Sequence, residues 1–294
     1  MNKLIMLLLS LSFIPLLLAS RPKVNVFSSN PWSEQYIESE SYFWKDIKSE
    51  EMIKMHCSEL LFPNIDPSVA KTYISVVSRE VPIVIIDNFL PIEMCTEIIS
   101  KAGTLTRSTV GDNQNVSQGR TSSTSWLHHE QCEIPLRLLM ERFSRLVGLP
   151  TENMEKLQVV KYGHGEHFGL HTDHQNSFNN LDVKGRLATC LIYLNSSNEE
   201  NGVSRGSFRG GATDFPEYGI QVFPRKGRAV FFFNTKQRPG AHGYDPRMDL
   251  EVEMKSRHRG QPVYDGTKWV ANCWVHPVSL ERDTRDTFEF TRMK

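Results

Sequence analysis

The sequence predicts a mainly β fold with flanking helices (α+β), built around a double-stranded β-helix of the jelly-roll, cupin-like type. Short runs rich in β-branched and aromatic residues recur through the second half of the chain, with turn residues between them. They fall at 157–162, 187–194, 220–223, 228–233 and 269–275. Their number and their spacing by turns favour a double-sheet barrel over a parallel α/β sheet.

The N-terminal residues have the order of a secretory signal peptide. Met1-Asn2-Lys3 is a short basic start, residues 4–18 are apolar apart from serines, and Ala19-Ser20 offers small residues for cleavage. The apolar run is shorter than the roughly 20 residues that span a bilayer, so we expect no membrane span after cleavage, with an uncleaved anchor as the alternative. The expected location is the endoplasmic reticulum lumen or the secreted fraction. The C-terminus has no retention signal, so residence in the reticulum would require a partner.

Length and patterning predict one large domain with a helical N-terminal extension. Helix-like patterning covers 41–61 and 66–79, and amphipathic helices at 91–102 and 133–147 are expected to buttress the barrel. The predicted divisions are a signal peptide at 1–20, the extension at 21–80, the main domain at 81–278 and a charged tail at 279–294. The 34 basic and 34 acidic residues balance, so nothing indicates a nucleic-acid surface.

The triplet His171-Thr172-Asp173 is the first candidate for a metal site. It follows a hairpin signal, in which the run 157–162 and the segment 168–170 flank a glycine-containing turn. On an extended strand, residues i and i+2 project to the same face, so one segment can present an imidazole and a carboxylate together. The pattern alone is weak, since about 0.4 such triplets are expected by chance in this composition. The segments His128-His129-Glu130 and His164-Gly165-Glu166 have the same type of spacing and are decoys.

A third ligand from elsewhere would complete an arrangement of two histidines and one carboxylate, which suits Fe(II) and leaves positions for a chelating cosubstrate and dioxygen. His258 is the candidate. His242 is the rival, because it also follows a strand and precedes the tryptophan-containing segment. Choosing His258 makes the loop 234–257 unusually long and charged.

Ordered motifs from about residue 83 to residue 277 resemble the catalytic domain of prolyl 4-hydroxylases, members of the Fe(II)- and 2-oxoglutarate-dependent dioxygenases. The motifs are Ile86-Asp87-Asn88-Phe89-Leu90, Arg120-Thr121-Ser122 with Trp126-Leu127, residues 162–173, Arg186-Leu187-Ala188-Thr189, the segment 210–216 and the segment 258–274. The resemblance covers about two thirds of the chain. It implies a jelly-roll fold and an enzyme of the procollagen-proline 4-dioxygenase type.

The resemblance also implies roles for individual residues. His171, Asp173 and His258 match the iron ligands, and Lys268 stands where the family binds the distal carboxylate of 2-oxoglutarate. A charged donor suits this role, because a carboxylate in a largely apolar barrel must be paired. Three further residues are expected in the cosubstrate pocket: Tyr162, Trp274 and Thr189.

The implied reaction hydroxylates peptidyl-proline at the 4-position in secretory-pathway proteins, with decarboxylation of 2-oxoglutarate to succinate and with L-ascorbate as rescuer of the iron. The polar segment 106–126 matches a loop that covers peptide in related enzymes. Arg186 and Arg120 are candidates for peptide contact, and an ion pair is the equal alternative for Arg186. The expected partners are a proline-containing polypeptide and either a protein disulfide isomerase or a second copy of the chain.

The sequence is also compatible with three other functions. A related dioxygenase acting on another residue or a small molecule is one, and a secreted binding protein without turnover is another. A zinc-binding protein is a third, using the four histidines His164, His167, His171 and His174.

The cysteines and the glycosylation sequons are relevant to the expected secretory location. Cys190 and Cys273 fall in buried-looking strands and are expected to be core thiols. A single bridge could form within the remaining set, Cys57, Cys95 and Cys132. Two sequons, starting at Asn115 and Asn195, are compatible with a glycoprotein.

Overall fold

The computed structural model describes residues 49–110, 115–128, 131–174, 185–199, 206–237, 250–277 and 280. The predicted signal peptide, residues 21–48 of the extension and the tail from residue 281 lie outside the described residues. No helix in the described part of the chain has the length and hydropathy needed to cross a membrane.

The largest element is an eight-stranded sheet in which all neighbouring strands are antiparallel. Its strands, in spatial order, are β1 (Ile74–Ser78), β2 (Ile83–Ile86), β13 (Ala229–Phe233), β9 (Ala188–Tyr193), β18 (Lys268–Val275), β7 (Leu157–Tyr162), β6 (Ser123–Leu127) and β3 (Thr106–Arg107). Five of the runs predicted as strands match strands of the structure to within one or two residues, including the whole of β7.

A second sheet of four antiparallel strands faces the first. In spatial order it contains β12 (Ile220–Val222), β11 (Thr213–Phe215), β16 (His258–Gly260) and β8 (Phe168–His171). Three two-stranded ladders complete the description: β10 (Phe208–Gly210) with β17 (Val263–Gly266), β14 (Thr235–Gln237) with β15 (Leu250–Val252), and β4 (Thr109–Val110) with β5 (Asn115–Val116). The segment 106–126, expected as a surface loop, therefore contains several short strands.

Alternation along the strands creates two cores. In β13, Ala229 and Phe231 point to the helical side of the large sheet, whereas Val230 and Phe232 point between the two sheets, as the period of two requires. Residues of the small sheet, such as Phe215 and Val222, share the second core with Val230 and Phe232. Two antiparallel sheets packed face to face confirm the predicted jelly-roll class.

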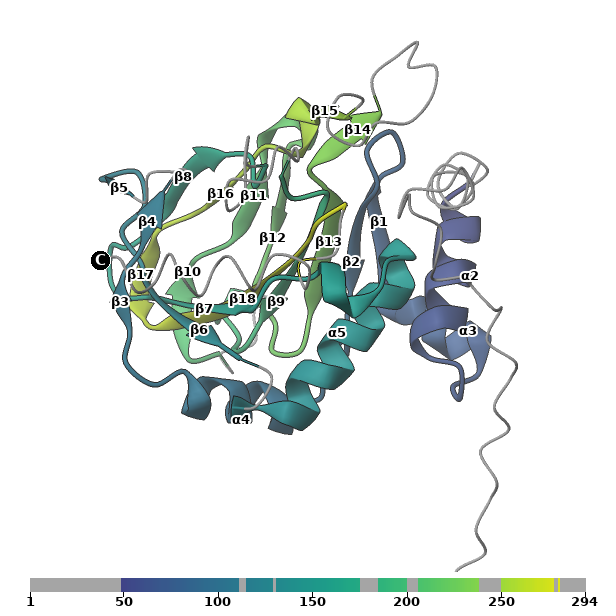
Figure 1. Cartoon of the computed structure of the whole chain (residues 1–294), viewed down its shortest axis with the longest axis horizontal. Coiled ribbons are helices and arrows are strands. Elements are labelled where there is room, and N and C mark those ends of the chain that lie inside the picture. The colour runs from purple at the N-terminus through teal and green to yellow at the C-terminus, as the bar shows by residue number, and fades with distance from the viewer. Residues whose placement is uncertain are drawn as a thin grey trace, which may run out of the picture.

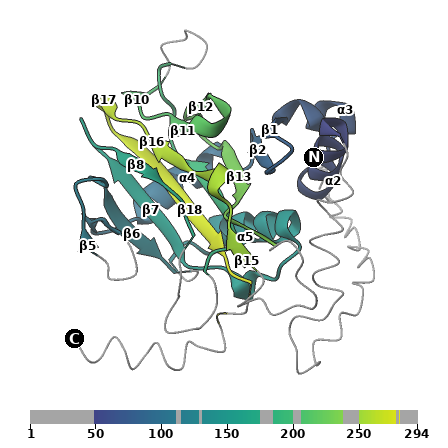
Figure 2. The same ribbon diagram turned by 90° about the horizontal axis from the view of Figure 1, so that it is seen from above.

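Helices pack against the outer face of the large sheet and beside its β1 end (Figures 1 and 2). They are α2 (Glu50–Leu61), α3 (Pro67–Ala70), α4 (Ile92–Lys101) and α5 (Glu133–Val147), with short 3-10 turns at Lys71–Tyr73, Thr151–Asn153, Pro216–Tyr218 and Met254–Ser256. Figure 1 shows α4 and α5 along one side of the strands, and Figures 1 and 2 both place α2 and α3 at the end of the molecule near β1. The helix α5 buries residues spaced three or four apart and ends at Gly148, which has the positive φ of a helix C-cap. The predicted helix at 133–147 is confirmed.

The predicted helix at 66–79 is wrong in its second half. The helix α3 and a 3-10 turn occupy only the first residues, and Ile74–Ser78 forms strand β1. Its β-branched residues Ile74, Val76 and Val77 favour extended backbone, and pairing with β2 satisfies the backbone hydrogen bonds. The first strand of the large sheet therefore lies before the predicted boundary at residue 81.

All five cysteines are buried free thiols, so the bridge considered among Cys57, Cys95 and Cys132 is not formed. Burial raises the pKa of Cys57 to about 12 and that of Cys95 and Cys132 to about 11. These residues belong to the core between the large sheet and the helices. The thiols act as small apolar groups in that core.

Candidate metal centre and cosubstrate pocket

The two sheets bring His171, Asp173 and His258 to one place. His171 is the last residue of β8 and His258 the first residue of β16, and the two strands pair with these histidines directly opposite each other. One ligand atom from each of the three residues lies within 4.8 Å of the other two. Asp173 lies in a bend just beyond the end of β8, so the expectation that one strand presents both His171 and Asp173 is wrong in detail. The chain turns there, and the carboxylate still reaches the histidines.

The orientation of each imidazole leaves Nε2 facing the cluster. Nδ1 of His171 lies 2.7 Å from the carbonyl oxygen of Gly169, and Nδ1 of His258 lies 3.1 Å from that of Ser256. Nε2 of His171 lies 3.3 Å from Oδ1 of Asp173, and Nε2 of His258 lies 3.9 Å from Oδ2. A backbone carbonyl at Nδ1 is the usual partner that orients a metal-binding histidine.

The protonation states of His258 and Asp173 favour the binding of a cation. Burial, followed by the nearby charge of His171, lowers the pKa of His258 to about 4, so its imidazole is neutral at neutral pH. Burial alone would raise the pKa of Asp173, but His258, His171 and Arg186 hold it well below its usual range. Metal ligands must be deprotonated, and two neutral imidazoles with one carboxylate form the donor set of non-haem Fe(II) sites. The residues therefore fit Fe(II).

Thr189 and Trp274 contact the carboxylate of Asp173. The hydroxyl of Thr189 donates to Oδ2 at 2.8 Å, and the indole Nε1 of Trp274 donates to the same oxygen at 3.1 Å. Asn234 in turn donates from Nδ2 to the Thr189 hydroxyl at 2.9 Å. Sequence reasoning placed Thr189 and Trp274 in the cosubstrate pocket and missed Asn234, although a polar residue directly after a buried strand is a usable signal.

Lys268 is a buried cation. It is 3% exposed, and its Nζ donates to the carbonyl oxygen of Gly211 at 2.6 Å. The rings of Tyr162 and Tyr193 lie 5.2 and 5.6 Å from Nζ, and Tyr162 is the direct cross-strand partner of Lys268. Burial lowers the pKa of Lys268 to about 7. Within the described residues no carboxylate forms an ion pair with it, so the pocket can accept a carboxylate from a ligand.

Arg120 supports the wall beside His171. It is 7% exposed and donates from Nη2 to Gln158 at 3.0 Å and from Nη1 to the Thr109 carbonyl oxygen at 3.1 Å. Its guanidinium lies 4.7 Å from the ring centre of Phe168, which stacks on His171 at 3.6 Å. Arg120 therefore holds the aromatic ring that covers one ligand.

Arg186 forms the ion pair that was the alternative to peptide contact. Its Nε and Nη2 donate to the two carboxylate oxygens of Glu155 at 2.6 and 3.0 Å. Its guanidinium also lies 3.4 Å from the ring centre of Trp274. One edge of the guanidinium is thus bound by Glu155 and one face stacks on Trp274, which is the ion-pair alternative of the sequence analysis.

Neither alternative ligand set is found among the described residues. His242 lies in 238–249, outside the described residues. Among the residues that the structure describes, the only group of three potential ligands is His171, Asp173 and His258, so the four-histidine zinc set is not gathered. Nδ1 of His164 instead lies 2.8 Å from the Tyr264 carbonyl oxygen.

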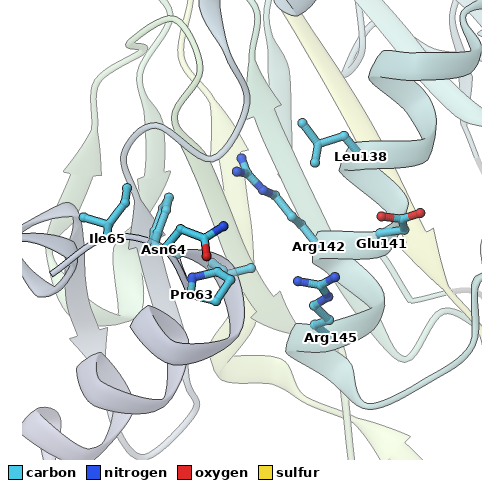
Figure 3. Close-up of a pocket in the computed structure, with 9 residues that line it drawn as sticks. Pro63, Asn64, Ile65, Leu138, Glu141, Arg142 and Arg145 are labelled. Atoms are coloured by element: carbon cyan, nitrogen blue, oxygen red, sulfur yellow. The ribbon is translucent and has the colours of Figure 1, made fainter. Parts of the chain in front are cut away.

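A groove on the helical side is separate from this site. Arg142 and Arg145 extend from α5 toward Pro63 and Asn64 in the loop after α2 (Figure 3). None of the predicted site residues lines this groove.

The sequon at Asn195 is engaged in the fold. Its Nδ2 donates to Ser207 Oγ and to the Thr267 carbonyl oxygen, both at 2.8 Å, and its Oδ1 accepts from the Trp269 backbone N–H at 2.8 Å. The amide that a glycan would modify is therefore taken up by internal hydrogen bonds. The side chain of Asn115 lies outside the description.

Comparison with known proteins gives matches at both the family and the sequence level. Residues 157–276 match the 2OG-Fe(II) oxygenase superfamily. Prolyl 4-hydroxylase 2 of Arabidopsis thaliana is 32% identical over 235 residues, which cover 74% of this chain and 73% of the relative. Prolyl 4-hydroxylase subunit alpha-2 of Caenorhabditis elegans is 30% identical over 213 residues, which cover 67% of this chain. The match spans only 35% of that subunit's length.

A solved structure is also similar. The viral collagen prolyl hydroxylase of Paramecium Bursaria Chlorella virus-1, in its 2OG complex, is 25% identical with a TM-score of 0.49. The match covers 67% of this chain and 96% of the viral chain.

Proposed function

The chain belongs to the prolyl 4-hydroxylase family of the 2OG-Fe(II) oxygenases and is a 2-oxoglutarate-dependent dioxygenase, and we propose that it hydroxylates peptidyl-proline at the 4-position. The observation that supports this most is the convergence of His171, Asp173 and His258 within 4.8 Å. Residues 87 positions apart in sequence meet there because β8 and β16 are neighbours.

His171, Asp173 and His258 would hold the metal. Fe(II) bound there supplies the oxygen chemistry that side chains lack, coupling decarboxylation of 2-oxoglutarate to succinate with hydroxylation of a C–H bond. The side chains of the protein bind the cosubstrate and orient the metal ligands. The rings of Phe232 and Phe215 lie 4.8 and 5.5 Å from the His258 ring and keep water from that side of the ligand.

Lys268 would pair with the distal carboxylate of 2-oxoglutarate. A charge-assisted hydrogen bond there would offset the hydration that the carboxylate loses in the barrel. Binding of the anion would in turn favour the protonated lysine, whose pKa burial has lowered to about 7. Tyr162 and Tyr193 would form the walls of this part of the pocket.

An exposed aromatic residue supports a proline-rich peptide as substrate. Trp126 is 42% exposed, and its ring lies 6.1 Å from that of Trp274, which contacts Asp173. Proline-rich segments arrive as preformed extended helices and dock on aromatic surfaces. Trp126 is therefore our candidate for the aromatic surface on which such a segment docks.

The cellular setting is part of the proposal. The signal-like residues 1–20 favour action in the endoplasmic reticulum lumen or after secretion, on proline-containing polypeptides of that route. Ascorbate is the proposed reductant that keeps the iron ferrous. A protein disulfide isomerase or a second copy of the chain is the proposed protein partner.

The test incubates the purified mature chain with Fe(II), ascorbate, 2-oxoglutarate and a panel of proline-containing peptides. The proposal predicts succinate release together with a peptide one oxygen heavier at proline. The His171→Ala variant should abolish both, whereas His164→Ala, a nearby histidine outside the cluster, should keep them. Turnover that is absent, or equal with and without peptide, would argue for the binding-protein or small-molecule alternatives.

A further inference from the structure

A buried charged network lies behind the metal centre. Glu155 is 5% exposed and accepts hydrogen bonds from Arg186 and from Nε2 of His276, which is 2.7 Å away. His276 follows directly on strand β18, which carries Trp274 two residues earlier. Because the carboxylate is held from two sides, the guanidinium of Arg186 has one position set by Glu155.

Arg186 in turn fixes the indole of Trp274. The guanidinium carbon lies 3.4 Å from the ring centre, which is direct stacking contact. Trp274 stands opposite Thr189 in the β18–β9 pairing, and both residues donate to Oδ2 of Asp173. A chain of contacts therefore runs from Glu155 through Arg186 and Trp274 to the carboxylate of Asp173.

The two hydrogen bonds decide which carboxylate oxygen is available. A carboxylate oxygen has two lone-pair directions, and Thr189 and Trp274 together occupy both on Oδ2. Within the described residues no hydroxyl or indole donates to Oδ1, which instead lies 3.3 Å from Nε2 of His171. If the indole tilted, Oδ2 would regain a free lone pair and the carboxylate could turn to offer both oxygens to a cation. Such chelation would take a position that the keto acid needs.

We propose that Arg186, held by Glu155, is a positioning residue that fixes Trp274 so that Asp173 presents only Oδ1 to the metal. This inference rests on the proposed function, since it concerns the same metal centre. It assigns Arg186 a role inside the protein, in place of the contact with peptide that the sequence suggested.

The experiment titrates Co(II), a spectroscopic stand-in for Fe(II), into purified full chain without cosubstrate. The test variants are Trp274→Phe, which keeps an aromatic ring but removes the N–H donor, and Arg186→Lys, which keeps the charge but removes the planar stack. Trp269→Phe is the matched control, because Trp269 lies on the same strand with Lys161 Nζ 5.8 Å from its ring centre and makes no contact with Asp173. Circular dichroism confirms that each variant is folded.

Both test variants should alter the Co(II) d–d absorption spectrum, because a carboxylate that offers both oxygens changes the donor set around the ion, and should change the Co(II) affinity relative to the parent chain. The control should leave affinity and spectrum unchanged. An unaltered spectrum and affinity for Trp274→Phe would overturn the inference even if Arg186→Lys failed to fold. A higher KM for peptide in Arg186→Lys, with an unchanged Co(II) spectrum, would overturn it in favour of substrate contact. Failure of the parent chain to bind Co(II) would instead overturn the proposed function itself, and this inference with it.

Discussion

Replacing Lys268 by methionine should make the protein without cosubstrate less sensitive to pH. Lys268 has a pKa of about 7 in the folded chain because of burial, against an ordinary value of 10.5. Between these values the unfolded chain binds more protons than the folded chain, so the unfolding free energy of the parent protein rises with pH. Methionine has a similar unbranched shape and does not titrate.

The magnitude follows from the two pKa values. Burying Lys268 at its lowered pKa costs about 4 kcal/mol at pH 7 and about 1 kcal/mol at pH 10, where the folded chain holds it as a neutral amine. Methionine also leaves the Gly211 carbonyl oxygen without its donor, which costs about 1–3 kcal/mol at every pH. The difference in unfolding free energy between Lys268→Met and the parent chain should therefore change by about 3 kcal/mol from pH 7 to pH 10.

The assay is urea unfolding of both proteins across this pH range. Other titrating groups are shared and cancel in the difference. The Lys161→Met variant, which removes a partly exposed lysine from the neighbouring strand β7, controls for the loss of a lysine as such. Saturating 2-oxoglutarate should stabilise the parent chain, by about 2.7 kcal/mol at a hundred times its Kd, and leave Lys268→Met unchanged. A difference that stays constant from pH 7 to pH 10 would show that burial does not lower the pKa of Lys268.

Three further outcomes are expected. Gly219→Ala places a Cβ at positive φ in open space and should lose about 1–2 kcal/mol of stability, whereas Gly211→Ala should lose more, because its new Cβ would also lie 2.8 Å from Lys268. Calorimetry should accordingly show 2-oxoglutarate affinity lowered roughly 10- to 100-fold for Gly211→Ala alone, and equal affinities would contradict the assigned pocket. Although burial opposes it, the charge of Arg186 holds the pKa of Glu155 at about 2 against 4.5, so the carboxylate contributes stability above pH 4.5 that disappears as the pH falls toward 2. Between pH 4.5 and pH 2 the unfolding free energy of the parent chain should fall by about 3 kcal/mol more than that of Glu155→Gln. Equal falls in the two proteins would disprove this role of Glu155. Peptide mapping of chain secreted from eukaryotic cells should find Asn195 without glycan, because its amide is hydrogen-bonded internally, and a glycan there would show that the described packing is wrong.

Local sequence patterns were enough to predict most of the barrel. The runs at 157–162 and 228–233 became β7 and β13 because their alternation feeds two cores at once, and this signal is contained within each run. The segment 74–78 was different. Its helix-like spacing was overridden by pairing with β2, a partner that the local pattern does not reveal.

The candidate site shows the same division. The residues that meet in it could be selected by type and order, since His171, His258 and Lys268 stand in positions that the family resemblance marks. The contact partners of each residue could not be predicted from the sequence. Thr189 and Trp274 were placed beside the cosubstrate, yet their register across β9 and β18 directs both to one oxygen of Asp173. Such contacts depend on strand register and side-chain direction, which sequence spacing does not fix.

The proposed reaction couples 2-oxoglutarate decarboxylation to proline hydroxylation at the centre formed by His171, Asp173 and His258. The most direct test follows the reaction under ¹⁸O-labelled dioxygen with a proline-rich peptide and reads both products by mass spectrometry. We expect one labelled oxygen in 4-hydroxyproline for each succinate formed, and neither product from His258→Ala. Hydroxyproline without label, succinate formed without hydroxyproline, or full turnover by His258→Ala would contradict it.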